Sequence, residues 1–204
     1  MQSLNTLLSL NVGCYKELVY IFYANLEKFV DNGKTRFRSF IRGIKIEFGE
    51  EELYETLGIP FTGREYTGPS SSGLSETERF DNIYVTGTQP VPQGWPKASR
   101  LKWESKQIHI FVNRCLLPLA SFDGVSALWA WVIDCIRHNF QINWYKIITD
   151  FMWTNRISKR STLPYGMMIS YFVILKGVPI TETDISTPPK YINSKLLAEM
   201  KIKK

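Results

Sequence analysis

Apolar residues in the central stretch, from Ser126 to Trp153, recur with the period of an α-helix. The first part is apolar from Ala127 to Val132 and turns polar toward Asn139, as expected of a helix buried on most sides. After a short break, apolar residues return at positions i, i+3, i+4, i+7 and i+8, which are Trp144, Ile147, Ile148, Phe151 and Met152. We expect these two helices to pair as a hairpin in the core.

The same criterion predicts four more helices. Residues 15–30 carry an apolar face and end at Asn32-Gly33, and residues 50–57 begin with three glutamates, which the helix dipole favours there. A basic helix over 101–117 ends at Pro118, and an apolar helix over 164–177 ends at glycine. The apolar face of the basic helix would hold Leu101, Ile108, Phe111, Val112 and Cys115.

Residues 36–48 have a different period. Ile44, Ile46 and Phe48 alternate with charged residues, and Arg42-Gly43 before them is typical of a tight turn. We therefore predict a mainly α fold, a compact bundle of about six helices with one small β-hairpin near residues 36–48. Residues 15–180 would form a single globular domain with a long loop at 61–99, between an N-terminal extension (1–14) and a basic C-terminal tail (181–204).

Composition is that of a folded protein that lives in a reducing compartment. Of the 204 residues, 44% are hydrophobic and 14% aromatic, which excludes a disordered chain. Three widely spaced cysteines imply no disulfide framework, so we expect a nuclear or cytoplasmic protein. The longest apolar stretch, MMISYFVIL, is too short to cross a bilayer, so no membrane contact is expected.

Several motifs, taken in order, resemble a known family. They are FYANL (22–26), FIRGIKIEF (40–48), LGIP (57–60), RCLLP (114–118), INWYKIITD (142–150) and LPYGMMISYFVILKGVP (163–179). Together they resemble the plant transposon protein domain, which occurs within or beside retroelement-derived genes. The resemblance covers roughly residues 15–180. It implies a plant origin, descent from a mobile element and a nuclear role, and it implies no reaction mechanism.

Candidate chemistry is sparse. Cys135 and His138 have C-x-x-H spacing, but two ligands make only half a zinc site, which His109 and Cys115 would have to complete. We expect no metal and no other cofactor. A metal-dependent nuclease or transposase remnant is the alternative function, and it would need carboxylates to converge on a cleft. The central candidates are Glu104, Asp123, Asp134 and Asp150.

Positive charge points instead to binding. The formal net charge is +6, and a group of cations could form one surface if residues 97–114 pack near 156–160. Tyr66 and Trp95 lie in predicted loops, where they could stack on bases. We expect a non-catalytic domain that binds DNA or RNA, or a protein partner; the sequence leaves the oligomeric state open. The candidate cations are Lys97, Arg100, Lys102, Lys106, Arg114, Arg156, Lys159 and Arg160.

Overall fold

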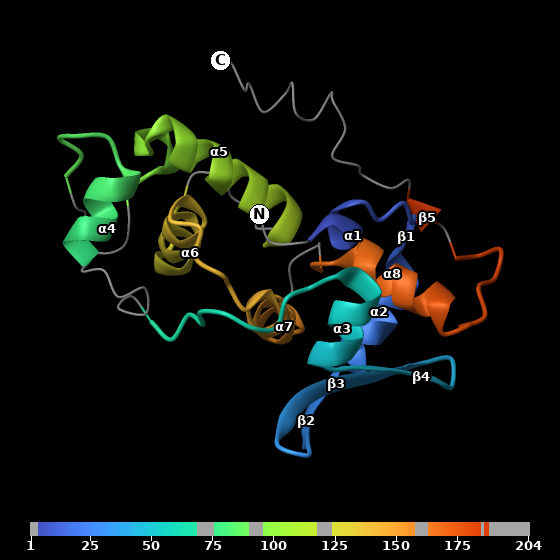
Figure 1. Cartoon of the computed structure of the whole chain (residues 1–204). Coiled ribbons are helices and arrows are strands. Elements are labelled where there is room, and N and C mark those ends of the chain that lie inside the picture. Colours follow the sequence, from blue (N-terminus) through green and yellow to red (C-terminus); the bar gives the residue numbers. More distant parts are fainter. Residues whose placement is uncertain are drawn as a thin grey trace.

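A three-stranded antiparallel sheet lies at one end of the molecule (Figure 1). The computed structural model describes residues 4–68, 76–89, 96–117, 124–157, 163–184 and 186–187. Strands β2 (Glu27–Asp31), β3 (Lys34–Ile41) and β4 (Ile44–Phe48) follow one another in the sheet. Both connections are two-residue turns with positive φ at each residue, 49° and 77° at Asn32-Gly33 and 51° and 79° at Arg42-Gly43. Such turns match the natural twist of a hairpin.

The inner face of the sheet is covered by helices α2 (Lys16–Ala24) and α8 (Gly166–Leu175), and α3 (Glu50–Leu57) follows β4 directly. Phe48 is the centre of this packing. Its ring centroid lies 6.3 Å from that of Phe22 in α2, 6.0 Å from Phe37 in β3 and 5.5 Å from Phe172 in α8. One side chain therefore joins two strands to two helices. We call these elements the sheet group.

The sheet group also includes the ends of the described chain. Helix α1 (Asn5–Leu8) packs on α3, and strand β1 (Cys14–Tyr15) pairs with β5 (Ser186–Thr187). The Arg42 guanidinium donates to both carboxylate oxygens of Asp184, at 2.7 and 2.8 Å. These contacts bring the chain after α8 back to the sheet. No helix among the described residues is long and apolar enough to cross a membrane.

A second set of elements, the α5 group, lies at the other end of the molecule (Figure 1). It comprises α4 (Glu76–Ile83), the short turn η1 (Ala98–Arg100), α5 (Trp103–Phe111), its π-helical continuation η2 (Val112–Leu116) and α6 (Ala127–Arg137). Helix α6 packs against α4 and α5. It is buried along most of its length, through Trp129, Ala130, Trp131, Val132, Ile133, Asp134 and Cys135.

Helix α7 (Trp144–Asn155) lies between the two groups (Figure 1). The Tyr145 hydroxyl donates to the Thr35 carbonyl in β3 at 2.7 Å, and the Trp153 ring meets Phe37 at 6.3 Å. Phe151 packs edge-on against Tyr165, the residue just before α8. Helix α7 thus packs on the sheet group, while α6 packs within the α5 group.

The predicted mainly α fold is confirmed, since about half of the described residues are helical. Its details differ. The described residues form eight α-helices in two groups rather than one bundle of six, and the predicted hairpin is the β3–β4 pair of a three-stranded sheet. The two central helices were predicted to pair as a hairpin; in the structure α6 makes its most extensive contacts with α4 and α5 instead.

The helix predicted over residues 15–30 was also too long. It ends at Ala24, and the apolar period that continues to Phe29 belongs to strand β2. Asn32-Gly33, interpreted as a helix end, is the turn of the β2–β3 hairpin, with Lys28 opposite Phe37. Cross-strand pairing overrides the weaker helical preference here. Phe29 lies under the Arg38 guanidinium at 4.9 Å on the outer face of the sheet.

The predicted loop at 61–99 contains ordered elements where it is described. An ordered piece was expected near residues 80–85, and α4 occupies 76–83. Arg64 forms a parallel bridge with Ile142. Most of the predicted C-terminal tail lies outside the described residues.

Replacing Phe48 by alanine should lower the free energy of unfolding by about 3–5 kcal/mol, because the cavity would open at the junction of four elements. Phe40 is the matched control: it lies on β3 with 45% of its surface exposed, against 1% for Phe48. Phe40→Ala should cost about 1 kcal/mol or less. Urea unfolding of both variants makes the comparison. Equal losses would contradict the packing described for Phe48.

Candidate nucleic-acid interface

The start of α5 is fixed by the end of α4. Tyr84 and Leu101, both buried, form an antiparallel bridge. The Val85 N–H donates to the Arg100 carbonyl at 3.0 Å, and the Lys102 N–H donates to the Ile83 carbonyl at 2.9 Å. These bonds hold the backbone on both sides of Leu101. The direction in which α5 leaves this bridge is therefore set by backbone pairing.

The rotation of α5 about its axis is unusual, because polar residues face inward. Ser105, His109 and Asn113 are buried at successive i, i+4 positions. An Arg137 guanidinium nitrogen in α6 donates to the Ser105 hydroxyl at 3.0 Å. Residues four apart share one helix face, so this stripe points toward α6. The face predicted from apolar spacing is only half-buried at Ile108, Phe111 and Cys115.

A neighbouring side of α5 carries charge and one large aromatic ring. Trp103, Lys106 and Arg114 follow at i, i+3 and i+11, which places them on one side of the helix. Trp103 has 51% of its surface exposed, and both cations are exposed. Lys97 and Arg100 are exposed just before the helix. We call these five residues the α5 face.

Positive charge is in clear excess on this segment. Residues 96–117 contain five cations (Lys97, Arg100, Lys102, Lys106, Arg114) and one carboxylate (Glu104), hence a net charge of +4 with histidine neutral. The whole chain carries +6. A basic segment of this density raises the local concentration of anionic ligands.

Lys102, a member of the predicted set, is used by the fold itself. Its ammonium donates to the Asp81 carbonyl at 2.7 Å, and the Arg137 guanidinium donates to the neighbouring Asn82 carbonyl. Both carbonyls belong to the last turn of α4, where the helix leaves its acceptors without intrahelical donors and cations are favoured. Lys102 therefore helps to anchor α4.

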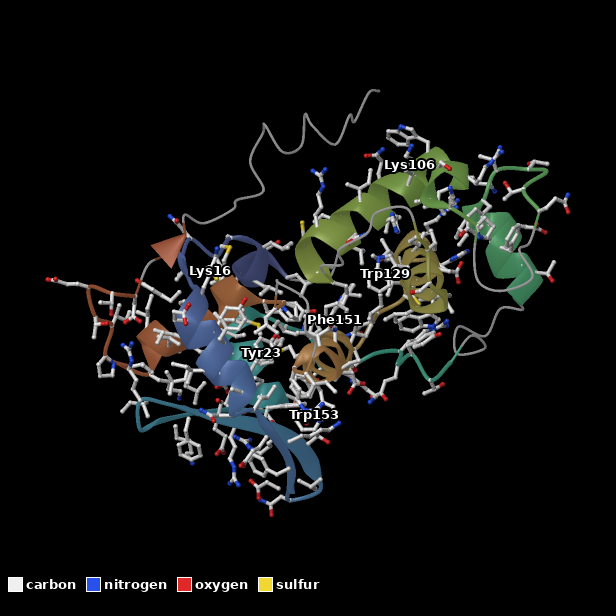
Figure 2. All side chains as sticks on the ribbon, turned by 180° about the vertical axis from the view of Figure 1, so that it is seen from behind. Lys16, Tyr23, Lys106, Trp129, Phe151 and Trp153 are labelled. Carbon is white, nitrogen blue, oxygen red and sulfur yellow. The ribbon has the colours of Figure 1, made fainter. Side chains whose placement is uncertain are left out.

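Arg156 lies apart from the α5 face. Its guanidinium stacks 3.4 Å from the Trp153 ring and donates to the Trp153 carbonyl at 2.6 Å. In Figure 2, Trp153 lies beside the sheet and Lys106 lies at the far end of the molecule. The structure does not bring Arg156 and the α5 face into one surface. Lys159 and Arg160 lie outside the described residues.

The two aromatic residues chosen from the sequence do not join this face where they can be placed. Tyr66 is half-buried and packs edge-on against the fully buried Trp131, with 5.7 Å between ring centroids. Its ring is therefore part of the core packing. Trp95 lies outside the described residues.

The cysteine and histidine candidates are not gathered into a metal site among the described residues. Cys135 is fully buried in α6, whereas the ring of His138 bonds the Asp134 carbonyl of its own helix at 2.9 Å. His109 lies on α5 with a hydrogen bond to the Gly124 backbone. Burial raises the pKa of the Cys115 thiol to about 11, so it is held as a neutral thiol.

The three described carboxylates of the proposed nuclease set lie on three different helices. Asp134 is fully buried on α6, 3.3 Å from the His138 ring. Asp150 on α7 pairs with Lys146 at 3.1 Å and faces Lys28 at 3.8 Å. Glu104 is exposed on α5, and Asp123 lies outside the described residues. Where they are described, these groups have local partners or face solvent.

Comparison with models of protein families identifies the family of this chain. A model of the plant retrotransposon-related domain matches residues 2–179. The chain belongs to this family. The match extends over nearly the whole chain and confirms the resemblance found in its motifs, and with it an origin in a mobile element. Searches among curated proteins and among solved structures found no match.

In this plant retrotransposon-related domain, the residue that sequence reasoning missed is Trp103. Its i, i+3 relation to Lys106 is visible in the sequence, yet the apolar pattern makes an indole at this position look like a core residue. Its exposure follows from the inward-facing Ser105 and His109, which the apolar period does not predict.

The stability of the domain should fall as the pH drops below about 6.5. Burial lowers the pKa of His109 from its ordinary value of 6.5, so the native state keeps the ring neutral. The unfolded chain takes up the proton first, which favours unfolding by at most about 1.4 kcal/mol per pH unit.

Urea unfolding between neutral and mildly acidic pH measures this loss. His109→Gln should reduce the loss between about pH 6.5 and 5, whereas His138→Gln, at a position with a 40% exposed side chain, should reduce it less. An unchanged pH dependence in His109→Gln would show that the ring is not held neutral by burial.

Proposed function

We propose that this plant retrotransposon-related domain binds nucleic acid without catalysing a reaction, through the α5 face. The observation that carries the proposal is the net charge of +4 on residues 96–117. Four of the five cations there are exposed. A polyanion with regularly spaced phosphates is the ligand class that such a face attracts most strongly.

Phosphate contact would supply the affinity. Each phosphate neutralised by a lysine or arginine releases counterions, so binding weakens as salt rises. The spacing of the α5 face suits several contacts in a row: Trp103 to Arg114 spans eleven helical steps, about 16 Å at 1.5 Å per residue. Four exposed cations would give a salt slope of up to about −3 to −4.

A protein partner fits the same face less well. Protein interfaces have cores depleted in charged residues and rich in aromatic ones. The α5 face has one large exposed aromatic residue, Trp103, among four cations. The three cysteines are free thiols, which fits a reducing compartment such as the nucleus or the cytoplasm.

The Lys106→Ala/Arg114→Ala double variant should weaken binding to DNA and RNA of any sequence. The slope of log affinity against log salt should become shallower by about 1.8 for duplex DNA and about 1.4 for single strands, because two phosphate contacts are lost. Lys16→Ala is the matched control: this exposed lysine lies on α2, away from Lys106 (Figure 2), and its removal should leave the slope unchanged.

Fluorescence anisotropy with labelled oligonucleotides, titrated with salt, makes this measurement. If wild-type protein fails to bind DNA and RNA even at low salt, the proposal is wrong. The search for a ligand should then turn to protein partners. If Lys16→Ala changes the slope as much as the double variant, binding is diffuse and does not use the α5 face.

A further inference from the structure

Among the tryptophans that the structure describes, Trp103 differs from the other four. Trp129, Trp131 and Trp144 are buried, with at most 3% of their surface exposed, and Trp153 is half-buried between Phe37 and Arg156. Trp103 exposes 51%. An aromatic ring exposed to this degree loses a substantial part of the free energy that its burial would contribute. Its surface is available to a ligand.

The backbone beneath the Trp103 ring is held firmly. The preceding residue, Lys102, is bonded through its N–H to Ile83 and through its ammonium to Asp81. Two residues later, Ser105 is buried and accepts from Arg137. The indole thus projects from a part of the helix that is fixed on both sides. A rigid platform loses little conformational entropy when a ligand stacks on it.

Exposed cations lie near this platform along the chain. Arg100 ends the short turn η1 before the helix, and Lys106 is exposed three residues after Trp103 in α5 itself. An anionic group attached to a ring stacked on the indole would meet this positive charge. Aromatic rings interleaved with cations suit a nucleotide chain, in which bases and phosphates alternate.

We infer that the nucleic acid bound by the α5 face is single-stranded, with an unpaired base stacked on Trp103 and its flanking phosphates on Arg100 and Lys106. The inference rests on the proposed function and specifies its ligand. In a duplex, neighbouring pairs cover both faces of every internal base, so the indole would find no partner. Stacking needs no particular base, so the binding should tolerate most sequences.

Insertion of α5 into a major groove explains the same residues less well. Recognition helices contact base edges with side chains near their N-terminal end. In α5 that end presents Trp103, whose single N–H donor is a poor reader of base edges, and the Gln107 carbonyl oxygen is buried. The α5 face offers stacking and charge, which are the means of single-strand binding.

The decisive experiment removes the ring from the protein and the bases from the ligand. The full chain is titrated with labelled oligothymidine of about eight nucleotides, with an abasic strand of equal length and with a duplex. Trp103→Ala should weaken binding to oligothymidine about five- to hundredfold, the equivalent of about 1–3 kcal/mol for one stacked base. Binding to the abasic strand and to the duplex should change less than about twofold, since no charge is lost.

Two further variants separate stacking from folding. Trp103→Phe keeps a smaller aromatic face and should recover much of the affinity for oligothymidine. Trp103→Leu keeps an apolar side chain without a ring and should behave like Trp103→Ala. Circular dichroism and urea midpoints close to wild type would confirm that each variant is folded.

The outcomes distinguish the two proposals. If Trp103→Ala and Trp103→Leu bind oligothymidine as wild type does, or weaken all three ligands equally, the single-strand inference is overturned. The proposed function then stands as long as Lys106→Ala/Arg114→Ala still lowers the salt slope. If wild-type protein binds none of the three ligands at low salt, both proposals fail together.

Discussion

The last turn of α4 must find hydrogen-bond donors outside its own helix, and the position of α5 follows from how it does so. A helix leaves its final carbonyls without intrahelical partners. Here all four are satisfied: Phe80 accepts from the Tyr84 N–H, Asp81 from the Lys102 ammonium, Asn82 from the Arg137 guanidinium and Ile83 from the Lys102 N–H. One end of one short helix therefore joins η1, α5 and α6.

This requirement divides the cations into two kinds. Lys102 and Arg137 lie over the negative end of the α4 dipole, where charge and hydrogen bonding both favour them. Arg137 also donates to Ser105, which holds the polar side of α5 inward. The remaining cations of residues 96–117 are turned outward as a consequence. A count of charges along the sequence treats all of these residues alike, and only the contacts of α4 separate them.

Short sequence motifs predicted the local structure correctly where each motif fitted only one kind of element. Arg42-Gly43 between alternating apolar residues predicted its hairpin, and the three glutamates that begin residues 50–57 predicted the helix α3, which spans these residues. Asn32-Gly33 has the same turn geometry, yet the helical period before it also allowed a helix end. The pairing of β2 with β3, a tertiary interaction, decides between the two.

The candidate site was predictable in charge and not in shape. The cations of residues 97–114 could be chosen from the sequence, but the exposure of Trp103 depends on an arginine 32 residues beyond Ser105. The same limit explains Tyr66, whose loop position gave no sign that its ring would pack against Trp131. Contacts between distant segments decide which aromatic rings are buried and which reach solvent.

The α5 face and the core contacts of the sheet lie at opposite ends of the molecule, which has a consequence for function. Phe48 and its aromatic neighbours tie the sheet to α2 and α8, and none of the five residues of the α5 face takes part in that packing. Substitutions on the face should therefore alter charge and stacking with little effect on the core, because distant sites without shared partners contribute independently to stability. Under the proposed function, such a domain could change its ligand preference through the α5 face while the sheet group keeps the fold intact.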